Sequence, residues 1–179
     1  MGTLMGFLKI LIGLVGAALL VVAALLIGAR FADGPLEMIA GGPFTSGDRY
    51  QGAEPDWSFV SDRESVEFQL LKPARSRTSW IIEHEGSIYI PSGYMNTTVG
   101  KIWKQWPIEA QRDGRALLRI DGRIYERQLI RIKTGPAVAP VVAKLTAKYF
   151  GGGDLEAENG MRQVASDDLW LFEMAPPAP

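Results

Sequence analysis

Residues 10–28 form the longest apolar stretch of the chain, which begins at Ile10, ends at Gly28 and reads ILIGLVGAALLVVAALLIG. The stretch contains no charged or amide side chain and is bounded by Lys9 and Arg30. At a rise of about 1.5 Å per residue, about twenty such residues cross a hydrocarbon core about 30 Å thick with every backbone group satisfied internally. The pattern therefore predicts one transmembrane helix, embedded in the lipid bilayer through these residues.

The alternative interpretation is a cleaved secretory signal, with Lys9 as its basic flank and Ile27-Gly28-Ala29 as its cleavage triplet. The apolar core is longer than that of a usual signal, which favours a retained anchor. The basic residues before and after the helix are nearly balanced, and the amino terminus together with Lys9 favours an inside amino terminus. We expect a single-pass protein of a bacterial-type inner membrane, with a cytoplasmic amino terminus and a periplasmic soluble part.

The segment 31–64 is rich in Gly, Pro, Asp and Ser and has no sustained hydrophobic period. It is predicted to be an extended tether or loop. Its apolar residues either pack on the following domain, which is the favoured interpretation, or rest on the membrane or a partner: Leu36, Met38, Ile39 and Phe44.

From residue 65 the pattern changes to short β-prone runs separated by turn signals. Strands are predicted at 66–71, 79–86 and 87–91, and the last two form an antiparallel hairpin that turns at Glu85-Gly86. A second hairpin, RALLRI–DG–RIYERQLIRIK, turns at Asp121-Gly122. A short helix is expected at 102–112, and helix-spaced apolar residues predict another at 137–150, ended by three glycines. A last strand is predicted at 169–174.

Six strands with two short helices predict a mainly antiparallel six-stranded split β-barrel (an α+β domain), since a nearly closed barrel leaves few exposed strand edges. The predicted organisation is an anchor at 1–30, a tether at 31–64, the barrel at 65–175 and a disordered tail at 176–179.

Composition excludes several classes of function. The chain has 19 basic and 20 acidic residues, interspersed, and no basic stripe that would suit nucleic acid. It has no cysteine, which excludes disulfides, thiolate metal sites and cysteine nucleophiles. His84 is the only histidine, and its neighbours Glu83 and Glu85 point to the opposite face of a strand, so no metal site is expected, although haem ligation by one histidine stays open.

Two segments carry a family resemblance: PARSRTSWIIEHEGSIYIPSG at 73–93 and KIWKQWPIEAQRDGRALLRIDGRIYE at 101–126. With the helix and strand that follow, they resemble the pyridoxamine-phosphate-oxidase-like split β-barrel, and within it the deazaflavin- or flavin-dependent nitroreductase branch. The resemblance spans residues 66–174 and implies an FMN or deazaflavin cofactor, often held between the protomers of a homodimer. It implies no catalytic acid or base, and it places cofactor contacts at Arg75, Ser76, Arg77 and Thr78 on the turn entering the second strand, Ser92 and Gly93 after the third strand, and Lys101, Trp103 and Lys104 at the following helix.

Each of these residues also has a purely structural interpretation. Arg75 and Arg77 are equally typical of solvated turn residues that pair with Glu64 or Glu67. The flat wall expected for a flavin ring, supplied by Trp80, Tyr89, Trp103 and Trp106, is equally typical of core aromatics.

Two functions follow from the sequence. The first is a membrane-anchored oxidoreductase that uses the reduced cofactor on a lipophilic acceptor such as a quinone or a nitro compound. The second is a non-catalytic accessory subunit of a larger membrane complex, whose helix packs against membrane-protein partners through Gly13, Gly16 and Ala17. The segment 94–107, rich in Trp, Tyr, Met and Lys, closes over a cofactor, rests on lipid or docks a partner; the residues alone leave these three open.

Overall fold

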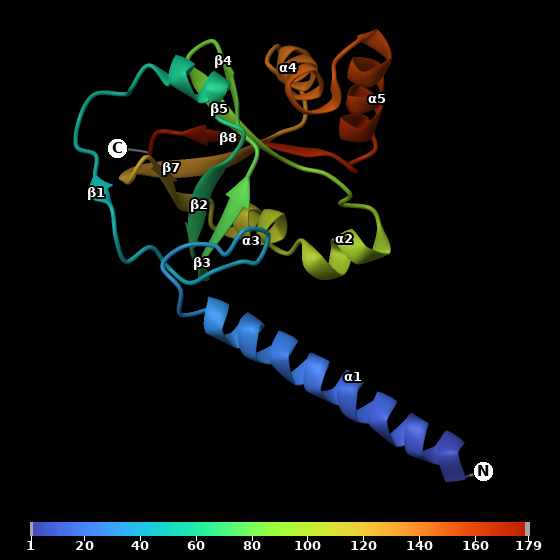
Figure 1. Ribbon diagram of the computed structural model, residues 1–179. Helices are drawn as coiled ribbons and strands as arrows, with labels where there is room; N and C mark the ends of the chain where they lie inside the picture. The colour runs from blue at the N-terminus through green and yellow to red at the C-terminus, as the bar shows by residue number, and fades with distance from the viewer. Residues whose placement is uncertain (1, 178–179) are drawn as a thin grey trace.

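The computed structural model describes residues 2–177, and the last two residues of the predicted tail, 178–179, lie outside this range. The predicted apolar helix is α1 (Gly2–Ala29), which projects away from the remainder of the molecule (Figure 1). An 18-residue window within Leu4–Ala29 has a mean hydropathy of 3.1 and is 0% buried. Length and composition suit a membrane span, and an amino-terminal signal sequence has the same two properties.

The body of the molecule is a curled, almost entirely antiparallel sheet with the strand order β3-β2-β6-β7-β8-β5-β4. The two end strands of this order, β3 and β4, follow each other directly in the chain. Within residues 2–177 no hydrogen-bond ladder joins them, so the barrel stays open there. The predicted split barrel is therefore confirmed, with eight strands rather than six. The strands are β1 (Asp48–Arg49), β2 (Val66–Leu71), β3 (Ala74–Ser79), β4 (Ile82–His84), β5 (Ser87–Ser92), β6 (Arg115–Ile120), β7 (Arg123–Ile132) and β8 (Trp170–Ala175).

Both predicted hairpins are present. β4 and β5 pair across Glu85-Gly86, and β6 and β7 pair from Arg115↔Gln128 to Ile120↔Arg123. The turn residues Asp121 and Gly122 have φ of 49° and 76°, as a two-residue hairpin turn of the primed type requires.

The prediction of a turn at 75–78 was wrong. These residues lie in β3, which pairs with β2 in register from Val66↔Ser79 to Leu71↔Ala74. The sequence ARSRTS lacks apolar alternation because β3 is an edge strand, whose polar side chains face solvent or the segment that covers it.

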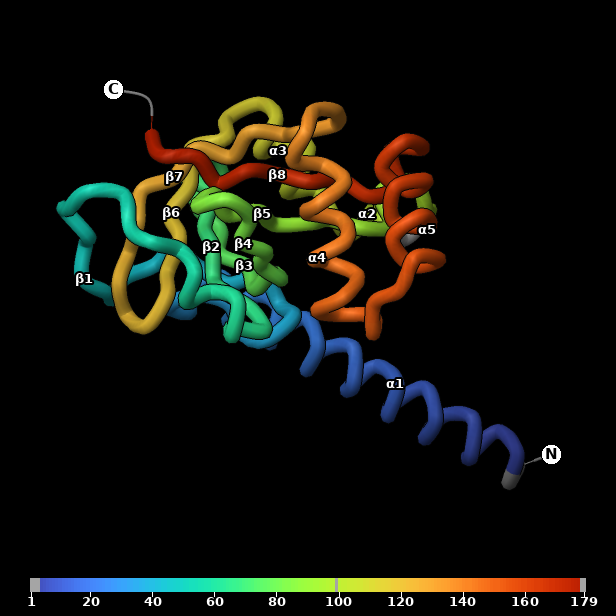
Figure 2. The backbone as a smooth tube through the Cα atoms, turned by 90° about the horizontal axis from the view of Figure 1, so that it is seen from above, coloured from blue at the N-terminus to red at the C-terminus, as the bar shows by residue number. Residues whose placement is uncertain are grey.

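Two apolar clusters hold the helices and strands together. Alternate residues of the strands point into the barrel, where Phe68, Leu70, Leu118, Ile90 and Phe172 are all 0% exposed. The opposite face of β4, β5 and β8 is covered by α4 (Val138–Phe150) and α5 (Asp154–Ala165), which pack side by side (Figure 2). The helix α4 was predicted and α5 was not, because α5 is polar overall and buries only Gly160 and Val164.

The predicted helix at 102–112 is two helices, α2 (Thr98–Trp103) and α3 (Trp106–Arg112). Pro107 lies in the first turn of α3, where its lack of a backbone N–H is tolerated.

The segment 31–64, expected to be a tether, is packed along the barrel, and we call it the strap. β1 pairs with β7 in parallel, and a 3₁₀ helix at Trp57–Asp62 places Trp57 and Val60 in the barrel core, each 0% exposed. The hydrophobic pattern does not predict this packing, because the segment is rich in glycine and proline and has no hydrophobic period. It is held to the barrel mainly by one large buried side chain, that of Trp57. The apolar residues of the strap differ in burial: Met38 is 91% exposed, whereas Phe44 lies under the Arg119 guanidinium at 4.2 Å.

Candidate functional site

Two of the β3 residues that were expected to bind a phosphate, Arg75 and Ser76, form hydrogen bonds with the strap instead. The Ser76 side chain is fully buried and its hydroxyl donates to the carbonyl of Gly42 at 2.6 Å. Its own carbonyl accepts from the Gly41 N–H at 3.0 Å, and Arg75 Nη2 lies 3.5 Å from the carbonyl of Ala40. In this conformation Arg75 and Ser76 fasten residues 40–42 to the edge of the sheet.

Arg77 faces α3 instead. Its Nη2 is 3.1 Å from Glu109 Oε2, and its Nη1 donates to the carbonyl of Arg75 at 3.1 Å. Burial lowers the pKa of Arg77, with the charge of Glu109 opposing that effect. The pairing partner is thus a residue of α3, neither Glu64 nor Glu67, and the side chain joins α3 to β3.

The other predicted residues form a separate group around the loop after β5. The Ser92 hydroxyl is buried against the Met95 sulfur at 3.4 Å, and Gly93 is half-buried. Lys104 lies 5.6 Å from the centre of the Tyr94 ring, and burial lowers its pKa while Asp168 opposes that effect. Lys101 and Trp103 point to solvent. The predicted residues on β3 and the lysines Lys101 and Lys104 therefore have different neighbours, and neither the cavity around Arg119 nor the one around Arg115 is lined by both groups.

The aromatic residues expected to form one flat wall are also separated. Trp80 stacks on Tyr149 of α4 with ring centres 4.5 Å apart and an interplanar angle of 12°. Trp106 packs into the barrel core against Phe68, and Tyr89 belongs to the cluster under α4. A flavin ring would find no common surface among them in this conformation.

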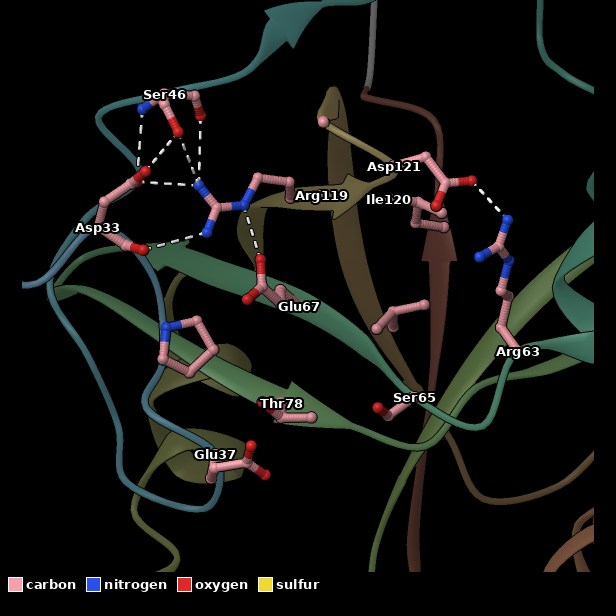
Figure 3. Close-up of a pocket in the computed structure, with 13 residues that line it drawn as sticks. Asp33, Glu37, Ser46, Arg63, Ser65, Glu67, Thr78, Arg119, Ile120 and Asp121 are labelled. Atoms are coloured by element: carbon pink, nitrogen blue, oxygen red, sulfur yellow. Dashed lines mark hydrogen bonds and ion pairs between the residues drawn. The ribbon is translucent and has the colours of Figure 1, made fainter.

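One open cavity of about 520 Å³ lies between the strap, β2 and β6. Figure 3 shows its centre, where Arg119 donates to Glu67 Oε2 at 2.6 Å and to Asp33 Oδ1 at 2.9 Å. Hydrogen bonds from the Ser46 hydroxyl and the Thr45 N–H hold the pKa of Asp33 well below its usual range, with burial opposing and Arg119 helping. A second ion pair, Arg63 to Asp121 at 2.6 Å, closes one side. Of the predicted site residues only Thr78 lines this cavity.

A second open cavity, of about 580 Å³, lies where the end of α3 meets β6 and β7. Three arginines, Arg112, Arg115 and Arg131, line it together with a single acid, Asp113. Arg115 bonds Asp113 through two nitrogens, at 2.9 and 2.6 Å, and these hydrogen bonds lower the pKa of Asp113 to about 2.

Arg131 is the most enclosed of the three arginines. It pairs with Asp167 at 2.6 Å, lies 3.4 Å from the Trp170 ring centre, and has a buried Nε without a hydrogen-bond partner among the described residues. Sequence analysis missed this cavity because its residues come from three elements and share no local motif.

Within residues 2–177 the structure contains no cluster of three or more His, Cys, Asp or Glu side chains arranged to hold a metal ion. His84 lies in β4 with no such neighbours.

Fold and surface together define an antiparallel split-barrel domain that follows a single apolar helix. Two solved structures resemble it. A conserved hypothetical protein, Rv2991 from Mycobacterium tuberculosis, is 13% identical with a TM-score of 0.49, over 72% of this chain and 86% of that one. A putative pyridoxamine 5'-phosphate oxidase from Listeria innocua is 12% identical with a TM-score of 0.44, over 68% of this chain and 90% of that one.

The second structure is named after pyridoxamine-phosphate oxidase, as is the fold family that the sequence resembles. The assignment to the nitroreductase branch stays a prediction. At these identities and TM-scores neither structure assigns an activity to this chain. No protein-family profile matches the chain, and no curated protein matches it.

Proposed function

We propose that the protein is a membrane-anchored accessory subunit, in which α1 spans the bilayer and packs beside a membrane partner while the barrel covers that partner's extramembrane surface. The observation that carries the proposal is the contrast between the apolar stretch of α1 and the end of that helix. The apolar window within Leu4–Ala29 is 0% buried within the chain, whereas Ala29, the last residue of α1, is packed and only 1% exposed. A helix of this hydropathy requires an apolar environment that the barrel does not supply.

The packing at Ala29 also bears on the signal-sequence alternative. The carbonyl oxygens of Arg30 and Ala32 lie 2.5 and 2.6 Å from where a Cβ on Gly42 would be, so the residues that directly follow α1 are packed closely against Gly42. Cleavage at the triplet Ile27-Gly28-Ala29 would cut directly beside residues that belong to the folded domain. Retention of α1 is the interpretation that this contact supports.

The face of α1 suited to a membrane partner is open. Around Gly13 and Gly16 no atom of the chain lies within 4 Å of a built Cβ, so close approach of a second helix meets no obstruction there. In the barrel, three of the residues that the sequence offered for a cofactor make internal contacts instead: Arg75, Ser76 and Arg77.

The test uses the full chain with a carboxy-terminal tag in its native membrane. Intact mass after purification establishes whether residues 2–28 are retained, and resistance to carbonate washing establishes integration. Gly13→Leu with Gly16→Leu is expected to reduce the recovery of co-purifying membrane proteins at least severalfold. Ala18→Leu, about 140° away around the helix, is the matched control and is expected to keep them. A cleaved chain, or equal recovery from both variants, would refute the proposal.

The flavin- or deazaflavin-dependent oxidoreductase remains a second candidate because of the arginine-lined cavity. The β3 residues do not fit a cofactor phosphate as they lie, since the strap and α3 already take their donors. Arg112, Arg115 and Arg131 would supply the positive charge that a phosphate requires, and a phosphate would have to compete with Asp113 for Arg115 and with Asp167 for Arg131. In this candidate the cofactor would supply electron transfer to a quinone or nitro compound, and the chain would only bind and orient it.

An absorbance spectrum of the gently purified protein decides between the two. A stoichiometric flavin or deazaflavin would establish the oxidoreductase and displace the accessory role. Its loss from Arg131→Met but not from Arg77→Met would place its phosphate in the arginine-lined cavity, and the reverse would restore β3. A colourless protein that arrives with other membrane subunits supports the accessory subunit.

A further inference from the structure

The loop after β5 and the short helix α2 carry a group of apolar side chains that the fold leaves in solvent. Tyr94 is 65% exposed, Ile102 is 75% exposed and Trp103 is 65% exposed. Lys101 is exposed beside them. We call these four residues the α2 patch. Large aromatic and branched side chains gathered on an exposed element indicate a contact surface more often than chance, because leaving them in water is unfavourable.

The α2 patch is held outward by specific contacts. The N–H of Met95 donates to the carbonyl of Asp168 at 3.0 Å, and the N–H of Asn96 donates to Asp168 Oδ1 at 2.9 Å. Thr97 caps α2 by accepting from the Gly100 N–H at 2.9 Å. A Cβ on Gly100 would lie 1.7 Å from the carbonyl of Tyr94, so the loop closes onto the helix as tightly as glycine permits. The exposure of Tyr94 and Trp103 is therefore built into the fold.

We propose that the α2 patch inserts into the interfacial region of the same bilayer that α1 spans, giving the barrel a second, peripheral contact with lipid. This inference rests on the proposed anchoring of α1. Trp and Tyr are the side chains enriched at membrane–water interfaces, and lysine beside them complements anionic headgroups.

The position of α2 fits this occupant. Figure 1 shows α2 at the lower edge of the barrel domain, on the side toward which α1 runs, and Figure 2 shows both helices on the same side of the barrel. Further exposed groups of the same kinds follow the end of α1. Arg30 is exposed, Phe31 is 83% exposed, and Met38 at the tip of the turn between Leu36 and Ile39 is 91% exposed. Cationic and apolar side chains therefore accompany both the spanning helix and the α2 patch.

Tryptophan quenching in liposomes tests the inference on the full chain. None of the five tryptophans lies in α1, so quenching by lipids with brominated acyl chains reports only on the barrel domain. Vesicles of phosphatidylcholine with phosphatidylglycerol are expected to quench part of the wild-type emission. Trp103→Phe should abolish that quenchable part. Trp80→Phe is the control, because Trp80 is 40% exposed but stacks on Tyr149 of α4, and the quenching should persist.

Two further measurements separate the outcomes. Ile102→Asp, which places a charge in the α2 patch, should lower the quenching of Trp103 at least twofold while flotation of the chain with the vesicles is unchanged. Flotation with Trp103 unquenched would overturn lipid docking and leave the anchor standing. Trp103 unquenched by lipid but shielded from acrylamide in native membranes would assign the α2 patch to a protein partner and also overturn it. Failure of the chain to float would refute the anchor and the docking together.

Discussion

Replacing Glu54 by glutamine tests whether the strap is an integral part of the barrel. Arg127 Nη1 and Nη2 donate to the two oxygens of Glu54 at 2.6 and 3.1 Å, and Trp57 Nε1 donates to Glu54 Oε1 at 2.6 Å. The Arg127 side chain is only 5% exposed, and its guanidinium lies 5.0 Å from the Trp57 ring centre. The glutamine would leave the Arg127 charge buried without a counter-charge.

The magnitude follows from the burial of the two partners. Removing one member of a fully buried pair costs about 3–5 kcal/mol. The Glu54 side chain is 41% exposed, so water screens roughly half of that, and the expected loss is about 1.5–2.5 kcal/mol. For a domain of this size a loss of about 1 kcal/mol lowers Tm by about 2–4 °C, so Glu54→Gln should lower Tm by roughly 3–10 °C.

The assay is a thermal melt of the full chain in mild detergent, followed by tryptophan emission, with Glu126→Gln as the matched control. Glu126 pairs with Arg49 at the same distance, 2.6 Å, but these side chains are 61% and 58% exposed, so the control should move Tm by less than about 2 °C. Arg127→Met and the double variant complete a cycle, in which the double variant should be more stable than the two single losses predict. Equal melting of the two glutamine variants, or a coupling below about 0.5 kcal/mol, would refute this account of the strap.

Two further predictions concern the strap. Burial raises the pKa of Glu54, but the hydrogen bonds from Arg127 and Trp57 outweigh it and leave the folded pKa below the ordinary 4.5. Its contribution is therefore complete above pH 4.5 and is lost as the pH falls through the folded pKa, so denaturant titrations should show wild type and Glu54→Gln fully separated at pH 6, with the difference narrowing as the pH is lowered below 4.5. Gly42→Ala places a Cβ against two backbone oxygens, at 2.5 and 2.6 Å, and should cost about 1–3 kcal/mol and expose the strap to limited proteolysis. Gly28→Ala meets no atom within 4 Å and should leave the digestion pattern unchanged.

The predicted site illustrates how far local signals reach. The sequence alone shows that Arg75 and Arg77 lie close together, because they are only two residues apart in the chain. Their partners come from elsewhere: Ala40 lies 35 residues before Arg75, and Glu109 lies 32 residues after Arg77. A pattern that spans a few residues carries no information about which distant segment will cover it. The arginine-lined cavity was missed for the same reason, because Arg112 and Arg131 meet only through the packing of α3 on β7.

The exposed α2 patch illustrates the converse. The composition of 94–107 indicated a contact surface with three candidate roles, and the fold leaves Tyr94, Ile102 and Trp103 in solvent while Trp106 enters the core. Trp103 and Trp106, three residues apart, thus differ in burial. The break between α2 and α3 separates them, with Trp103 at the end of α2 and Trp106 at the start of α3.

The sequence by itself determined the elements whose cause is local. An unbroken apolar run specifies α1, because most of its residues are good helix formers such as Ala and Leu. The Asp121-Gly122 turn specifies the β6–β7 hairpin, because its left-handed backbone suits few other residue pairs. Tertiary structure alone decided that β3 is a strand, that Trp57 anchors the strap in the barrel, and that Glu54 meets Arg127 across 73 residues. These features depend on the burial of one side chain by many distant neighbours, and the free energy of such contacts exists only once the barrel has closed around them.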